Sequence, residues 1–380
     1  MLRTVDKQYD DQFARQGAKI GSALRIRLPN DYIVGTGKSV TPQGTNEVST
    51  TMTLATQKNV TVAFGSAERT LSLDDYSERV LAPAVNNLAG AVALDLMSVA
   101  LSSVGMVYNP GSGGAIQSPT AGTFLLAGAI LDQASAPKKN RQIMLDPMTQ
   151  ARTITTLAGL FNPQVKISEQ YESGEMSRDT LGFDWNYDQT ILKPTTGTCT
   201  GFTVNGANQT GNTLVVNAIT GTLNIGDVIT LAGVNSSNRI TKQDNGTLAQ
   251  FVLTAAAANG ATSLSIYPSI TPPLAGVAVQ YQTVTASPAN GAAGTPVLPA
   301  ATQYRKNLAY YPEAFTMATA DLETPQRGVV EVARESYDDV SMRMITAYDV
   351  LGDNLITRLD ILYGYLAVRP EWSTTVADIL

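Results

Sequence analysis

Residues 35–39, Gly-Thr-Gly-Lys-Ser, have the composition of a phosphate-binding loop, in which backbone N–H groups and a lysine hold the phosphates of a nucleotide. The full motif requires a glycine five residues before the second one, and Tyr32 occupies that position. The loop is followed by Val-Thr-Pro at 40–42, not by a helix whose N-terminus would bind an anion. The sequence therefore predicts a turn here and no nucleotide chemistry.

The chain contains no histidine, so it lacks the usual general base near neutral pH and the commonest metal ligand. Ser-His-Asp and Cys-His catalysis are excluded. The single cysteine, Cys199, excludes an intrachain disulfide and lies in a Thr/Gly-rich stretch without a catalytic partner. The carboxylate pairs Asp74-Asp75 and Asp338-Asp339 have the chemistry to bind a hard cation, but adjacent acids are ordinarily solvated. We therefore predict no enzyme activity and no catalytic, cofactor-binding or metal-binding residue.

Composition narrows the class of protein further. The net charge of -6 and the pI near 4.9 argue against a domain that binds nucleic acid tightly, because tight binding to the phosphate backbone needs a basic face. The N-terminus lacks the apolar stretch of a signal peptide, and no run of about 18 apolar residues appears. We therefore expect a protein that is made and folded in the cytosol, without a membrane span.

Charged residues are distributed unevenly along the chain. Residues 197–300 contain only four of them, Asp227, Arg239, Lys242 and Asp244, out of 26 basic and 32 acidic residues in total. Within this segment, turn residues separate six candidate strands, at 202–206, 213–219, 226–234, 249–255, 262–268 and 276–284. The pattern predicts a small antiparallel barrel or sandwich. Because the flanking sequences match each other in type, we interpret residues 197–300 as an insertion, called the insert below.

The first half of the flanking sequence predicts strands and one long helix. Residues 24–29 and 51–64 alternate between apolar and polar side chains, which indicates two strands joined by a turn-rich hairpin or extended loop. Apolar residues recur every three or four positions from Leu81 to Val99 and predict an amphipathic helix over about residues 73–104, roughly 45 Å long. Pro83 would mark a kink or a second helix start. Leu88 and Val92 would lie in the middle of its buried stripe.

Further elements complete an α+β body. Residues 123–134 predict a second helix and residues 141–145 a buried strand. Asp146 then caps a third helix that has proline at its first position and ends near Leu160. Beyond the insert, residues 308–380 predict more strands.

The order of these parts resembles the coat proteins of tailed bacteriophages of the P22 type, which have the Hong Kong 97-type capsid fold and an immunoglobulin-like insertion domain. The sequences that carry the resemblance are GAKIGSALRIRLPN at 17–30, TLSLDDYSERVLAP at 70–83, GLFNP at 159–163, GDVITLAGV at 226–234 and ILYGYLAVRPEW at 361–372. The family usually has a further helical stretch before the segment at 5–13, where this sequence has only four residues.

The resemblance implies an α+β fold with six parts. They are an N-terminal arm (1–30), an extended β-hairpin loop (31–70), a spine-helix or peripheral domain (71–135), the first part of an axial α+β domain (136–196), an inserted β-barrel (197–300), and strands of the axial and peripheral domains (301–380).

The resemblance also implies a function. The chain would be a major capsid protein that self-assembles into pentamers and hexamers of an icosahedral head, around a scaffolding protein and with portal and decoration proteins as further partners. The head would enclose double-stranded DNA without sequence-specific binding, and it would be assembled in the cytoplasm of a bacterial host. Two alternatives remain: a secreted β-rich adhesin or carbohydrate-binding protein, and a carboxylate-dependent hydrolase.

Five charged residues are candidate assembly contacts. Arg239, Lys242 and Asp244 lie within the loop 235–246, where they either keep a solvated loop soluble or meet the same loop across a two-fold axis, pairing unlike charges reciprocally. Lys38 and Glu47 are the candidates in the extended loop.

Overall fold

The computed structural model describes residues 5–7, 23–34, 38, 48–65, 80–157, 180–274, 279–325, 331–337 and 340–380. The chain forms two compact units. The first unit consists of Met1–Leu28, Val48–Leu96 and Phe315–Val368, and the second of Pro29–Glu47, Met97–Ala314 and Arg369–Leu380. Each unit therefore combines segments that are far apart in the sequence. Helices and strands occur in both, which agrees with the predicted α+β class.

The first unit is built on a sheet around its longest described strand, β19 (Asn354–Ala367). Along most of its length β19 pairs antiparallel with β4 (Thr56–Gly65) and with β18 (Val340–Asp349). The other strands of this sheet are β16 (Phe315–Ala320), which pairs with the end of β19, β17 (Glu331–Tyr337), which pairs with β18, and the short β1 (Asp6–Lys7), parallel to β16.

The predicted strands at 24–29 and 51–64 are present in the first unit, the second of them divided in two. β2 (Ala23–Arg27) pairs antiparallel with β3 (Ser49–Thr53), and β4 follows after a short break. Strand β3 passes so close to β19 that a Cβ at Gly364 would lie 2.4 Å from the carbonyl oxygen of Thr53. Glycine is therefore required at this point of β19.

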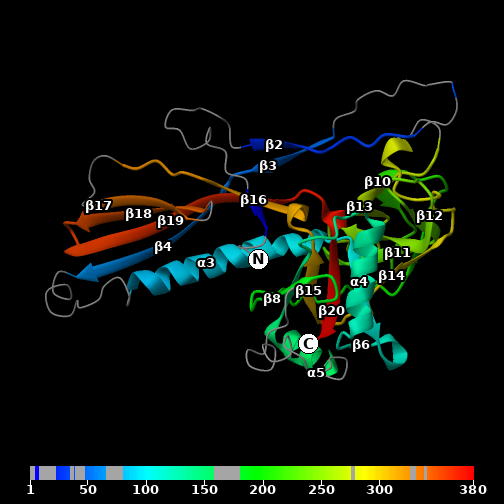
Figure 1. Ribbon diagram of the computed structural model, residues 1–380, viewed down its shortest axis with the longest axis horizontal. Helices are drawn as coiled ribbons and strands as arrows, with labels where there is room; N and C mark the ends of the chain where they lie inside the picture. Colours follow the sequence, from blue (N-terminus) through cyan, green and yellow to red (C-terminus); the bar gives the residue numbers. More distant parts are fainter. Residues whose placement is uncertain are drawn as a thin grey trace. The chain divides into compact units, whose positions relative to one another are not determined.

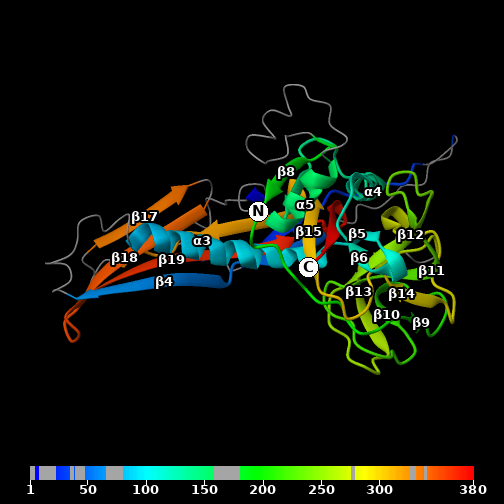
Figure 2. The same cartoon turned by 90° about the horizontal axis from the view of Figure 1, so that it is seen from below.

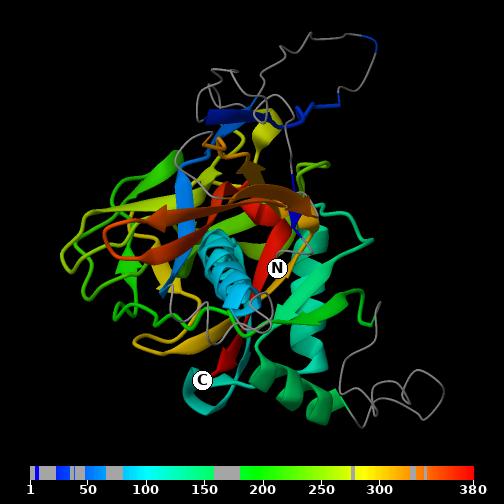
Figure 3. The same ribbon diagram turned by 90° about the vertical axis from the view of Figure 1, so that its left-hand side faces the viewer.

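The long amphipathic helix is α3 (Ala82–Met97), and it carries one row of buried residues at every fourth position: Ala84, Leu88, Val92 and Leu96. This confirms the buried stripe predicted from the sequence. Figures 1 and 2 show α3 running alongside β4 and β19, and Figure 3 shows it nearly end-on, in cyan. The one charged residue of α3, Asp95, accepts hydrogen bonds from Lys58 Nζ of β4 (2.8 Å) and Tyr363 Oη of β19 (2.6 Å).

The α-helix ends earlier than the sequence pattern predicts. A 3-10 helix, η2 (Ser98–Ser102), follows Met97, and Ser102 Oγ donates a hydrogen bond to the Val99 carbonyl at 2.6 Å. Local serine-to-backbone bonds of this kind compete with continuation of an α-helix. Pro83 is the second residue of α3, and Val80 and Leu81 before it already have π-helical geometry, so the proline lies at a change of helix type and not at the first turn of the helical segment. Residues 73–79, the beginning of the predicted helix, lie outside the described residues.

The second unit contains a mixed sheet centred on β15 (Tyr304–Tyr310). Its strands are β15, β20 (Ser373–Ile379) and β7 (Gln142–Leu145) on either side of it, then β5 (Gly105–Pro110), β6 (Ile116–Gln117) and β8 (Asp184–Tyr187). All seven residues of β15 are buried, although three of them are Arg305, Lys306 and Asn307.

Two helices belong to this sheet, and both follow the sequence prediction. Helix α4 (Ala121–Gln133) lies against β5 and β20 and buries Phe124 and Leu131. Helix α5 (Pro147–Leu157) begins with the predicted cap, because Asp146 Oδ1 accepts a hydrogen bond from the backbone N–H of Met148 at 3.0 Å. Short 3-10 helices complete the described structure of this unit: η3 (Ser112–Gly114), η4 (Val279–Tyr281), η5 (Pro312–Ala314) and η6 (Pro370–Trp372).

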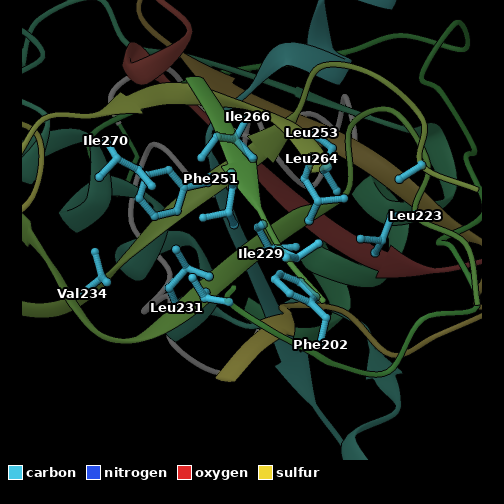
Figure 4. Packing of buried hydrophobic residues seen from close by; sticks show 14 of the residues in the cluster. Phe202, Leu223, Ile229, Leu231, Val234, Phe251, Leu253, Leu264, Ile266 and Ile270 are labelled. Atoms are coloured by element: carbon cyan, nitrogen blue, oxygen red, sulfur yellow. The ribbon is translucent and has the colours of Figure 1, made fainter. Parts of the chain in front are cut away.

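The insert forms its own antiparallel six-stranded sheet. In sheet order its strands are β10 (Gly211–Val215), β13 (Ser263–Ile270), β12 (Asp244–Leu253), β11 (Val228–Ser237), β14 (Ala293–Pro296) and β9 (Phe202–Thr203). Their inward side chains, among them Phe202, Ile229 and Phe251, form one apolar core (Figure 4). Five of the six predicted strands are therefore confirmed.

Of the sixth predicted strand, at 276–284, the described part is paired only at its end, where Val284 forms an isolated antiparallel bridge with Ser236 of β11. The described part of that segment includes the 3-10 helix η4, and β14 takes the sixth place from a stretch whose Ala, Gly and Pro content is typical of a linker. Gly294 explains the choice, because the ring of Phe202 lies where a Cβ would be, 2.2 Å away. The strand beside Phe202 must therefore lack a side chain at this position, and Gly294 of β14 meets that requirement.

We expect Leu88→Ala to lower the free energy of unfolding by about 2–5 kcal/mol, because Leu88 is only 4% exposed and its removal would leave a cavity under α3. Leu94→Ala is the matched control, since Leu94 lies on the same helix but is 50% exposed and should cost about 0.5 kcal/mol or less. Urea denaturation of the unassembled chain measures both, and equal losses would contradict the assigned buried face.

Candidate functional site

The charged hairpin of the insert connects β11 to β12, with Ser237 opposite Asp244 at its base. The turn is closed by hydrogen bonds between the backbones of Asn238 and Gln243 (2.8 Å) and of Lys242 and Asn238 (2.9 Å). Its three charged residues do not share one exposed tip. Arg239 and Lys242 are half-buried, and Asp244 is exposed.

Arg239 binds two carboxylates of its own chain. Its Nε lies 2.8 Å from Asp31 Oδ2, and its Nη1 lies 3.3 Å from Glu371 Oε1. Glu371 also accepts a hydrogen bond from Tyr267 Oη of β13 at 2.9 Å. We call these four residues, Asp31, Arg239, Tyr267 and Glu371, the Arg239 cluster. It joins the segment after β2, the insert and η6.

Burial and charge act together on the cluster. Burial lowers the pKa of Arg239, but the hydrogen bond and charge of Asp31, with the charge of Glu371, raise it further than burial lowers it. Burial and the neighbouring Glu371 carboxylate raise the pKa of Tyr267 well above its usual value. The arginine therefore stays charged and the tyrosine stays a hydrogen-bond donor at any physiological pH.

The remaining candidate contacts differ in their surroundings. Lys242 Nζ donates to the backbone oxygen of Gln280 at 2.6 Å. Asp244 accepts hydrogen bonds from the Asn235 side chain (2.9 Å) and the Gly246 backbone (2.7 Å), and these lower its pKa. Lys38 is exposed, and Glu47 lies outside the described residues. The structure thus brings none of the five into an ion pair with another of them among the described contacts.

The entry and exit strands of the insert form a closed neck. The backbone N–H of Thr196 donates to the Thr302 carbonyl (3.0 Å), and the N–H of Thr302 donates to Thr196 Oγ1 (2.9 Å). Further along, the Tyr304 N–H donates to the Pro194 carbonyl and the Lys306 N–H to the Leu192 carbonyl. The insert therefore leaves and rejoins the sheet of the second unit at adjacent points.

Two buried charged side chains, Lys306 and Asp227, lie beside this neck. Lys306 of β15 is fully buried, and its Nζ lies 3.2 Å from the carbonyl oxygen of Gly226 in the insert. The neighbouring Asp227 accepts backbone hydrogen bonds from Gly197 (3.0 Å) and Asn224 (2.8 Å). Burial lowers the pKa of Lys306 to about 8, against the opposing charge of Asp227, and burial likewise raises the pKa of Asp227.

Apolar and amide contacts extend the same junction. Val228 and Val252 of the insert share a core with Met106 of β5 and Tyr304 of β15. The side-chain amide of Gln250 binds both backbone groups of Met106, accepting at 2.7 Å and donating at 3.0 Å. The insert is therefore fixed to the sheet by packing, by paired amides and by charge.

Sequence reasoning missed Asp31, Glu371 and Lys306. A signal was present for Lys306, because the run Tyr-Arg-Lys-Asn-Leu-Ala-Tyr mixes charges into a strand that ends in apolar residues. No local pattern marks Asp31 or Glu371, since the residues they bind are more than a hundred positions away.

Other residues with chemical potential give no reactive site in the described part of the chain. Cys199 is buried and reduced, with its Sγ 3.5 Å from the Gly201 carbonyl. The described residues contain no cluster of three or more Cys, Asp or Glu side chains that could hold a metal ion. The pairs Asp74-Asp75 and Asp338-Asp339 lie outside the described residues.

One segment meets a simple test for a membrane span. Ala82–Ser102 is long and apolar enough by length and mean hydropathy, with Asp95 as its one charged residue, although Asn86 and Asn87 interrupt it so that it is not a continuous apolar run. Within the first unit, however, Leu88 and Val92 are buried and Asp95 is bound to Lys58 and Tyr363. We therefore interpret α3 as a core helix.

Comparisons with known proteins identify the family of the chain and solved structures that are similar to it. The sequence matches the P22 coat protein family (gene protein 5) over residues 20–375, and the chain belongs to this family. A search of curated proteins found no match. Among solved structures, the capsid of Ralstonia phage GP4 is similar with a TM-score of 0.50 at 7% identity, covering 99% of this chain and 87% of the other.

Two further structures are similar. The capsid of Cyanophage P-SCSP1u has a TM-score of 0.46 at 10% identity, covering 99% of this chain and 86% of the other. The CUS-3 coat protein I-domain is 27% identical over 26% of this chain and 94% of its own, with a TM-score of 0.22.

Family membership defines the role of the protein. It is a structural component of a phage virion, a capsid protein that works as part of an oligomeric assembly. The expectation of a secreted adhesin has no support in these findings.

We expect the stability of the unassembled chain to rise between about pH 8 and pH 10, because of Lys306. Its pKa of about 8 lies below the ordinary value of 10.5, so the unfolded chain binds more protons in this window and folding is favoured as pH rises, by up to about 1.4 kcal/mol per pH unit. Lys306→Met should flatten the rise in urea denaturation measured at each pH. Lys138→Met is the control, since Lys138 is exposed, and an equal flattening there would contradict the assignment.

Proposed function

We propose that this coat protein assembles into pentamers and hexamers of an icosahedral head that encloses double-stranded DNA. The observation that carries the proposal is the family match over residues 20–375. The net charge of -6 supports it, because a wall around DNA should not bind the phosphate backbone tightly. On the same basis, we propose that assembly occurs in the cytoplasm of the bacterial host, with a scaffolding protein, a portal and decoration proteins as partners.

Exposed apolar side chains at turns support extensive contacts with other copies. Leu351, in the turn between β18 and β19, is 99% exposed, Val34 is 89% exposed and Ile240, in the insert hairpin, is 73% exposed. These side chains are free to contact neighbouring copies, but scattered singly they are also normal on a protein surface, so the family match carries the proposal. A shell subunit offers many such positions, and each contributes a small contact that the assembly repeats.

The insert is proposed to be an immunoglobulin-like barrel that serves as the insertion domain at residues 197–300. Its antiparallel strand pairing and separate core support this, as does an isolated bridge between Val204 and Val216, which links the end of β9 to the end of β10. The other proposed parts are the arm, the extended loop, the spine helix and the axial domain of the capsid fold.

Electron microscopy of the purified protein tests the assembly. We expect closed shells or sheets of capsomers, because a coat subunit gains most of its stability in the lattice from repeated contacts. Dispersed monomers under all assembly conditions would contradict the proposal.

We expect residues 197–300 to fold without the rest of the chain, because every residue of the core around Phe251 lies between Cys199 and Val284. The isolated fragment should give dispersed amide resonances and a cooperative melt. Phe251→Ala should abolish the melt, and a fragment with neither property would show that the insert depends on the sheet of the second unit.

We expect Asp244→Arg to divert assembly into tubes, aberrant shells or free capsomers if the hairpin meets its counterpart across a two-fold axis. Exposed ion pairs contribute little singly, but a shell repeats each of them at every equivalent contact. Asp244→Asn is the control for the turn geometry. It removes the charge, but the asparagine oxygen can still accept the hydrogen bond from the backbone N–H of Gly246. Particles of normal size and yield from Asp244→Arg would leave Asp244 as a solvated residue.

A further inference from the structure

The residues that Arg239 binds include Asp31, which lies in the stretch leading into the predicted extended loop. We call the described stretch 29–34 the loop root. A second residue of the insert contacts it, because Tyr281 Oη lies 3.4 Å from Asn30 Oδ1. The insert therefore reaches two consecutive residues of the loop root, Asn30 and Asp31, through polar contacts.

The apolar side chains of the loop root are largely exposed and are not packed in a core. Asn30 and Asp31 are half-buried, whereas Tyr32, Ile33 and Val34 are exposed. Exposed apolar side chains contribute little to fixing an extended segment, and the polar contacts of Asn30 and Asp31 join the loop root to the insert.

The chemistry of the cluster suits a clamp within one chain. The planar guanidinium of Arg239 presents its N–H groups in a fixed fork, so one side chain binds Asp31 and Glu371 at the same time. Tyr267 holds the other oxygen of Glu371. With both carboxylates supplied by its own chain, Arg239 has its charge already balanced before any neighbouring subunit arrives.

We propose that the Arg239 cluster is an intrachain clamp that fixes the loop root on the insert, and that Arg239 acts in assembly as a positioning residue and not as a contact between subunits. Fixing an extended segment in advance reduces the entropy that is lost when it binds a neighbour. The clamp itself stands without the proposed shell; only its effect on assembly rests on that function.

Limited trypsin digestion of the unassembled chain tests the clamp, because Lys38 is exposed just beyond the loop root. Asp31→Asn and Arg239→Gln should each speed cleavage after Lys38 about tenfold, the change expected when a charge-assisted hydrogen bond is lost. The double variant should be no faster than either single one, since both remove the same pair. High ionic strength should speed cleavage of the native chain but not of Arg239→Gln.

Arg334→Gln is the matched control, because it removes a half-exposed ion pair with Asp321 that does not involve the loop root. It should leave cleavage after Lys38 unchanged. Native cleavage rates in Asp31→Asn and Arg239→Gln, or additive effects in the double variant, would overturn the clamp.

Particle yield then tests the positioning role. A contact that Arg239 made with another subunit would be lost in Arg239→Gln but kept in Asp31→Asn, whereas a clamp predicts equal losses of correctly formed particles in both. Normal yield from Asp31→Asn together with a loss from Arg239→Gln would overturn the positioning role. If the native chain itself formed no particles, the proposed shell function would fail, and the digestion result would still decide the clamp.

Discussion

A lysine ammonium group buried in the middle of a sheet is the constraint on which the second unit depends. Removing Lys306 from water costs several kcal/mol unless an opposite charge and hydrogen-bond acceptors replace the lost hydration. The replacements, the Gly226 carbonyl and the Asp227 carboxylate, both come from the insert. The sheet around β15 and the insert are therefore completed together, and the position of one on the other is restricted to the arrangement that joins these groups.

The rest of the junction follows from that restriction. Asp227 also binds the backbone of Gly197, so the same carboxylate that balances Lys306 closes the first turn of the insert. The side-chain amide of Gln250 bonds the backbone N–H and C=O of Met106, in the way that a neighbouring strand would. This extends the junction along β12 and β5. A polar junction of this kind adds little to stability, but it disfavours alternative dockings, in which Lys306 would be buried without a partner.

The sequence predicted what depends on neighbours along the chain. The stripe on α3, the Asp146 cap and five strands of the insert follow from local spacing and residue type, and the structure confirms them. Strand β14 could not be predicted, because its glycine suits a partner, Phe202, ninety positions away. The Arg239 cluster was hidden for the same reason: Asp31 and Arg239 are 208 residues apart, and each alone is an ordinary surface charge.

The closed neck of the insert has a consequence for how such a module is exchanged between related chains. Because Thr196 and Thr302 are joined directly, the body would accept a short turn or an unrelated module with adjacent ends in place of the insert. Any such exchange, however, removes Asp227 and leaves Lys306 without its counter-charge. The residue at position 306 and the carboxylate in the first turn of the module must therefore change together during evolution. Relatives that lack the insert should carry an apolar residue at this position of the strand. A transplanted module must supply its own carboxylate.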